Sequence, residues 1–154
     1  MAIARSALLV ELLMSVDRVI TAAQSATTSD DPDAWSPAVV VGHLSQVDEQ
    51  VWIPRLNLMA ESIDSAPPEF TWWEPDPVAT AEAFRAASVD DASAQLLASR
   101  TRLLHLLRDF TDTQWRATAL HDVFGEIDVE ALTLRVLAHD EEHRATLLLG
   151  GGRD

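Results

Sequence analysis

Two histidines near the end of the chain, His139 and His143, have the spacing of a helical metal site. Residues four apart lie on the same face of a helix, one turn from each other, so both imidazoles can reach a single point beside the helix. A third imidazole, His43, lies far upstream in another segment with helical periodicity. Three imidazoles on two helices can hold a divalent ion and leave coordination positions open for chemistry.

The residues alone leave a second interpretation open. Five histidines in 154 residues will sometimes fall four apart by chance, so His139 and His143 could be helix-face side chains and His43 a core or cap-region histidine. The periodicity places all three rings on apolar stripes, so they are expected to point inward. An unpartnered buried polar group costs about 1–3 kcal/mol, and a shared ion would satisfy three at once.

Glu142, next to His143, is the candidate catalytic residue. A carboxylate beside a metal ligand can act as a base or as a hydrogen-bond acceptor. The alternative, a solvated carboxylate on the helix surface, is the favoured interpretation. A surface position is also expected for the other acidic residues near the histidines, Asp48, Glu49, Asp140 and Glu141.

The remaining histidines and the tryptophans receive structural interpretations. His105 lies between two leucines and is expected to pack or to be partly exposed, while His121 is expected in a loop and has little weight as a ligand. Packing at the end of the bundle is expected for Trp52, Trp72 and Trp73.

Four long segments with helical periodicity carry these residues: 4–23, 36–53, 89–110 and 129–149. Ser36 and Pro37 mark the start of the second segment as N-cap and first helical residue. Pro54 is expected to end or kink that helix, which can resume beyond it. The other expected elements are a short helix over 78–86, loops over 25–34 and 65–77, a connection over 111–126 and a tail over 150–154. The sequence therefore predicts one all-α domain, 1–154, folded as a four-helix bundle with a long Pro- and Trp-containing connection between its second and third helices.

The composition excludes several classes of function. Acidic residues outnumber basic ones by 25 to 11, and the net charge of −14 would repel a nucleic-acid backbone or an anionic membrane surface. No stretch approaches the roughly 20 apolar residues that span a bilayer. The absence of cysteine excludes disulfides, thiolate ligands and cysteine nucleophiles. We expect a cytoplasmic protein by default, without a nucleic-acid or membrane partner.

Taken together, these segments resemble the DinB family, which includes YfiT-type proteins and the mycothiol- and bacillithiol-dependent enzymes. The resemblance covers about 4–149 and rests on the Trp-Ser-Pro-started helix that carries His43, the segment 124–129 and the His139-x-x-x-His143 motif. It implies an up-down-down-up four-helix bundle, a homodimer and a three-histidine site. The implied ligands are His43, His139 and His143, and the implied ion is zinc, nickel, iron or manganese.

The leading hypothesis is a metal-dependent transferase in which a low-molecular-weight thiol attacks a small electrophile. Metal binding favours the thiolate, which is the nucleophilic form. The eleven cationic residues are all arginine; this is typical of a GC-rich genome and favours mycothiol as the thiol. Two alternatives stay open: a hydrolase in which the ion lowers the pKa of water, and a non-catalytic, stress-associated interaction domain with a structural metal.

Overall fold

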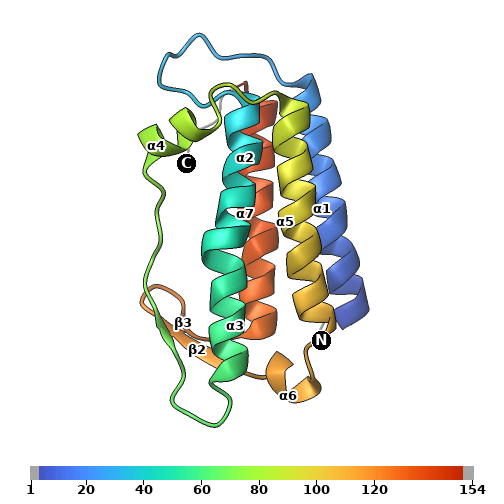
Figure 1. Cartoon of the computed structure of the whole chain (residues 1–154), viewed down its shortest axis with the longest axis vertical. Coiled ribbons are helices and arrows are strands. Elements are labelled where there is room, and N and C mark those ends of the chain that lie inside the picture. Colours follow the sequence, from blue (N-terminus) through green and yellow to red (C-terminus); the bar gives the residue numbers. More distant parts are fainter. Residues whose placement is uncertain (1–3, 151–154) are drawn as a thin grey trace.

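Four long helices lie side by side along the molecule in a computed structural model (Figure 1). The structure describes residues 4–150. The first, third and fourth long helices are α1 (Arg5–Ser25), α5 (Val89–Arg108) and α7 (Val129–Leu148). The second is built from α2 (Pro37–Val47), a π-helical turn η1 (Asp48–Trp52) and α3 (Ile53–Glu61). In Figure 1, α1 and α7 run upward and the other two run downward, which confirms the up-down-down-up bundle.

The helices begin where the sequence supplies caps. The Ser36 hydroxyl accepts a hydrogen bond from the Val39 amide at 3.3 Å, directly before α2. Ser88 and Asp91 form a reciprocal capping box at the start of α5. The Asp128 carboxylate accepts from the amide of the third residue of α7 at 2.8 Å. Each cap satisfies an amide that has no partner within its helix.

Pro54 does not end the second helix, which continues to Glu61. The π-helical turn directly before it absorbs the disturbance: the Ile53 amide donates to the Asp48 carbonyl, five residues back. Proline lacks an amide hydrogen, and its ring collides with the preceding turn of a regular helix. A wider turn at this point relieves the collision and adds a residue to the turn, a distortion that often accompanies functional sites.

The expected connections contain short elements of their own. They are β1 (Glu69–Phe70), α4 (Pro77–Ala83), α6 (Asp112–Trp115), β2 (Thr118–His121) and β3 (Gly125–Asp128). The strands form a small sheet in the order β1-β2-β3, with β1 parallel and β3 antiparallel to β2. His121 lies opposite Gly125, whose φ of 74° suits the end of a tight hairpin. Strands of two to four residues are too short for periodicity to reveal.

The apolar core has two halves. One lies toward the lower end of the bundle in Figure 1 and includes Leu12, Leu56, Leu103 and Val136. The other lies toward the upper end and includes Val19, Val40, Leu44, Leu96 and Leu147. Between the two halves lies a layer of buried polar side chains.

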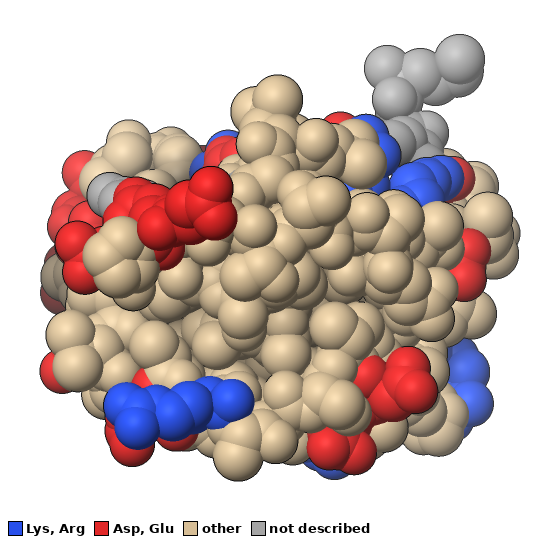
Figure 2. Space-filling view, turned by 90° about the horizontal axis from the view of Figure 1, so that it is seen from above, with Lys and Arg blue, Asp and Glu red and all other residues tan. Residues whose placement is uncertain are grey.

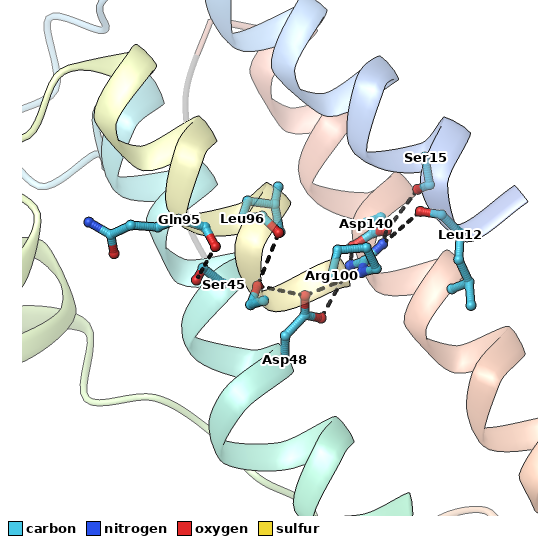
Figure 3. Close-up of polar contacts among 9 residues, drawn as sticks. Leu12, Ser15, Ser45, Asp48, Gln95, Leu96, Arg100 and Asp140 are labelled. Carbon is cyan, nitrogen blue, oxygen red and sulfur yellow. Dashed lines mark hydrogen bonds and ion pairs between the residues drawn. The ribbon is translucent and has the colours of Figure 1, made fainter. Parts of the chain in front are cut away.

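A guanidinium group in this polar layer joins all four long helices (Figure 3). Arg100 of α5 is 1% exposed and donates to both carboxylate oxygens of Asp48 at 3.2 Å. It also donates to both oxygens of Asp140 on α7, at 2.8 and 3.0 Å, and to the Leu12 carbonyl on α1 at 3.0 Å. Each of the five N–H donors of the guanidinium therefore has an acceptor.

The expectation that Asp48 and Asp140 lie at the surface is wrong, because both are almost completely buried. Their neighbours Glu49 and Glu141 are exposed as expected. Two carboxylates share one guanidinium, and burial raises the pKa of Asp48 to about 6 despite the attraction of Arg100. Ser15 and Ser99 donate to the two carboxylates at 2.7 and 2.9 Å and complete the polar layer.

The chain as a whole is acidic, with a net charge of −14. Viewed from above, the end of the bundle has a mainly uncharged centre with small groups of acidic and basic residues around it (Figure 2). None of the helices in the described part of the chain is both long enough and apolar enough to cross a membrane.

The polar layer predicts a large difference between two arginines of α5. Replacing Arg100 with Met leaves two buried carboxylates without a cation, so we expect a loss of about 3–5 kcal/mol in the free energy of unfolding. The control is Arg102→Met, which removes an exposed ion pair with Glu49 and should cost no more than about 1 kcal/mol. Urea denaturation measures both, and equal losses would contradict a stabilising role for the layer.

Candidate metal centre

The structure brings together the three histidines that the sequence singled out. His43 comes from α2, and His139 and His143 come from successive turns of α7. Each offers a ring nitrogen, and the three nitrogens lie within 4.8 Å of one another. The Nε2 atoms of His139 and His143 are 3.2 Å apart. His43 and His143 are buried, whereas His139 is partly exposed.

A side chain outside this cluster orients the His43 ring. Nδ1 of His43 lies 3.3 Å from Oε1 of Gln46, which also accepts a hydrogen bond from the Thr80 hydroxyl at 3.2 Å. Because an amide oxygen only accepts, Nδ1 of His43 must carry the proton in this contact. The lone pair of the neutral ring is then on Nε2, and a partner of this kind is typical of metal-binding histidines. Sequence reasoning missed Gln46, although its position three residues after His43 places it on the same helix face.

The donor set fits a divalent ion such as zinc. Imidazole nitrogens bind such an ion at about 2.0–2.1 Å, so nitrogens already within a few ångströms need only small ring movements to share one. Among residues 4–150, the cluster consists of the three imidazoles, without a carboxylate or a fourth histidine. Three protein ligands are the number found in catalytic zinc sites, which keep a further position for water or substrate.

A cavity of about 540 Å³ opens beside the cluster. It lies between the second long helix, α7 and the segment that climbs from the sheet toward α4 (Figure 1). Its walls include both His139 and Glu142. The volume is that of a small-molecule site. Of the three histidines, His139 lies in the cavity wall, so the cluster borders the cavity through this ring.

Aromatic rings surround the histidines on the cavity side. The Trp52 and His139 ring centroids are 6.0 Å apart, and the Trp73 ring stacks on His43 at 6.3 Å. Trp52, Trp72 and Trp73 all line the cavity. The expectation that these tryptophans only pack the end of the bundle is therefore incomplete, because they also form the walls of a site.

The other candidate residues lie in different places. Glu142 is exposed and lines the cavity, so it is both a surface carboxylate and a neighbour of the histidines. His105 is exposed on α5 and is not in the cluster. His121 is buried at the end of β2, not in a loop, and lines the cavity without joining the three donors. Two cavity residues, Arg55 and Arg135, were not identified from the sequence.

Comparison with known proteins agrees with this geometry. A profile of the DinB superfamily matches residues 7–147, most of the chain. The chain belongs to the DinB superfamily. Among solved structures, YfiT from Bacillus subtilis is similar to this chain, with a TM-score of 0.70 and 25% sequence identity. The match covers 95% of this chain and 86% of YfiT, which is described as a probable metal-dependent hydrolase with an unusual four-helix bundle topology.

A mutant of mycothiol-dependent maleylpyruvate isomerase is also similar, with a TM-score of 0.65 and 10% identity. That match covers 94% of this chain and 61% of the isomerase, and at this identity it shows the fold alone. A search of curated protein sequences gave no match. For this member of the DinB superfamily, the three-histidine cluster and the metal-dependent neighbour together support a divalent ion.

The cluster predicts that the untagged protein carries close to one divalent ion per chain. His43→Ala and His143→Ala should each abolish this metal content, because two imidazoles hold an ion far more weakly than three. Gln46→Leu should lower metal affinity by about 10–100-fold, because it removes the partner of His43. Inductively coupled plasma mass spectrometry and competition with a chelator measure these changes.

The matched control for these variants is His105→Ala, which removes an exposed histidine of α5 and should leave the metal content unchanged. A folded wild-type protein that is free of metal, and that takes up no added zinc, nickel or manganese, would contradict the prediction.

Proposed function

We propose that this protein is a metal-dependent transferase that joins a low-molecular-weight thiol to a small electrophile. His43, His139 and His143 would hold the ion, which is zinc, nickel, iron or manganese. The observation that carries the proposal is that the cluster borders, through His139, a cavity of about 540 Å³. A thiol and a small electrophile can meet in this cavity next to His139.

The residues of the cavity have distinct parts in this reaction. When bound, a divalent ion lowers the pKa of a thiol and so favours the nucleophilic thiolate. Glu142 lines the cavity three residues after His139, about one helical turn away, and its carboxylate can accept the thiol proton. The rings of Trp52 and Trp73 lie beside His139 and His43, with centroids 6.0 and 6.3 Å apart, and would shield these histidines from water. The thiolate sulfur forms a bond to an electrophilic carbon of the substrate, and the leaving group on that carbon, such as a halide, departs with the electron pair of the broken bond.

A hydrolase is the second candidate, and the similarity to YfiT, a probable metal-dependent hydrolase, favours it. The same histidines and the same cavity would serve, with water in place of the thiol. Glu142 would then accept a proton from water. The two candidates differ in whether the reaction requires a thiol.

A purely structural metal fits the geometry less well. Structural sites are closed by four protein ligands, whereas the described residues supply a cluster of three imidazoles. One of them, His139, is partly exposed and lines the cavity. An interaction domain that used metal only to hold its helices together would have no need of this opening.

The proposal predicts thiol conjugation that depends on Glu142. Metal-loaded protein should accelerate the reaction of mycothiol with 1-chloro-2,4-dinitrobenzene, followed by absorbance and mass spectrometry of the conjugate. Glu142→Gln should lower the rate by about 100-fold or more while the metal stays bound, because the amide cannot accept the proton.

Glu141→Gln is the matched control. Glu141 is adjacent and exposed, but it pairs with Arg144 and does not line the cavity. This variant should keep the wild-type rate. Ester hydrolysis that proceeds equally well without thiol would favour the hydrolase. Activity with neither thiols nor esters would contradict both candidates.

A further inference from the structure

The cavity has a second group of polar side chains, here termed the basic corner: Arg55, His121 and Arg135. They come from α3, the end of β2 and α7, and all three line the cavity. The pKa of His121 lies below its ordinary value because burial strips water from the ring. The nearby guanidinium groups of Arg55 and Arg135 lower it further, against the attraction of Asp122. His121 and Arg135 both lie against the Phe124 ring, at 4.6 and 4.4 Å from its centre, and Arg55 lies over Phe70, which is the strand partner of His121. The three side chains therefore lie around one part of the cavity.

His121 is arranged as a neutral hydrogen-bond donor. Its Nδ1 atom accepts from the amide of Val123 at 3.0 Å and from the amide of Phe124 at 3.3 Å. A nitrogen that accepts carries no proton, so the hydrogen of the neutral ring is on Nε2. The hairpin turn between β2 and β3 thus fixes the tautomer and supplies the corner with one N–H group.

The two guanidinium groups have no carboxylate partner within the described part of the chain. Arg55 donates to the Thr71 carbonyl at 2.6 Å and lies over the Phe70 ring, with its central carbon 4.9 Å from the ring centre. Arg135 lies over the Phe124 ring at 4.4 Å. Burial lowers the pKa of Arg55, and the attraction of Asp122 opposes this shift. Guanidinium groups form strong, directed hydrogen bonds to a carboxylate.

Charge varies along the part of α7 that lines the cavity. Arg135 precedes His139 by four residues, which is about 6 Å along the helix axis. Glu142 follows His139 by three residues and lies on the opposite side of it. Along α7, the guanidinium group and the carboxylate therefore lie on opposite sides of His139, and Asp33 and Glu74 are the other acidic residues that line the cavity. The rings of Trp52, Trp72 and Trp73 provide an apolar wall.

We propose that the basic corner binds the carboxylate of an organic monoanion whose apolar body lies against the tryptophans and extends toward His139. This inference rests on the proposed function, in that the same cavity receives the substrate. Arg55 and Arg135 attract the carboxylate, and the N–H of His121 donates to it. The carboxylate thereby places a reactive carbon of the substrate next to the histidine cluster.

Equilibrium binding of a matched pair of probes tests the proposal without any need for turnover. We would titrate the purified holoprotein with 2-naphthoate and with its uncharged analogue 2-naphthamide by isothermal calorimetry. Naphthoate should bind at least about tenfold more tightly, because the hydrogen bonds of a guanidinium group to a carboxylate are stronger than those to a neutral amide oxygen. Arg135→Gln should remove most of this preference, and Arg55→Gln with Arg135→Gln should abolish it with little effect on naphthamide.

Two further variants test whether the preference for naphthoate comes from the basic corner, from the metal or from the net charge of the protein. Arg108→Gln removes an exposed arginine that pairs with Asp109 outside the cavity, and it should keep the full preference. His143→Ala removes a metal ligand that does not line the cavity, and it should also keep the preference.

If the preference for naphthoate is lost in His143→Ala but kept in the Arg55 and Arg135 variants, the carboxylate binds the metal and the proposal is overturned. Failure of both probes to bind would overturn it as well, whereas a missing thiol reaction with the preference intact would overturn only the proposed function.

Discussion

The ion cluster of Arg100 with Asp48 and Asp140 is the interaction on which the rest of the structure depends. One guanidinium contacts the second long helix, α7 and α1, so the four helices meet in one arrangement that satisfies all of its donors. An apolar layer tolerates small shifts of one helix against another. In a buried cluster of hydrogen-bonded charges, the same shift leaves a charged group without its partner. Asp140 directly follows His139. Its bonds to Arg100 therefore fix the rotation of α7 and direct the two imidazoles toward α2.

The π-helical turn sets the direction of the side chains on the second long helix, as Asp140 does on α7. It absorbs Pro54 and turns Asp48 into the polar layer, while Trp52 and Arg55, farther along the same helix, line the cavity. A single pair of helices thus supplies the three histidines, the Trp52 ring and both guanidinium groups of the basic corner. The small sheet adds His121 from the side. The three histidines thus lie on two packed helices, and His139 faces the cavity beside them.

Much of the bundle and the three histidines could be predicted because long helices repeat their apolar residues and the His139-x-x-x-His143 spacing is local. The polar layer was missed because charged residues were assigned to the surface, although Arg100 lies on the same stripe of α5 as three buried leucines. The sheet and the basic corner join residues far apart in the chain through two- to four-residue strands, which no local pattern reveals. The homodimer and the cytoplasmic location stay predictions.

The most direct test of the central claim is X-ray absorption at the edge of the bound metal, before and after addition of a thiol. If three histidines hold the ion and one position is open, the spectrum before thiol addition should show about three imidazole nitrogens at roughly 2.0–2.1 Å and one oxygen ligand such as water. After thiol addition, a sulfur at about 2.3 Å should replace that oxygen. Loss of the nitrogen shell in His43→Ala would tie the signal to the cluster. A spectrum of four protein ligands that does not change when thiol is added would contradict the claim and indicate a structural ion.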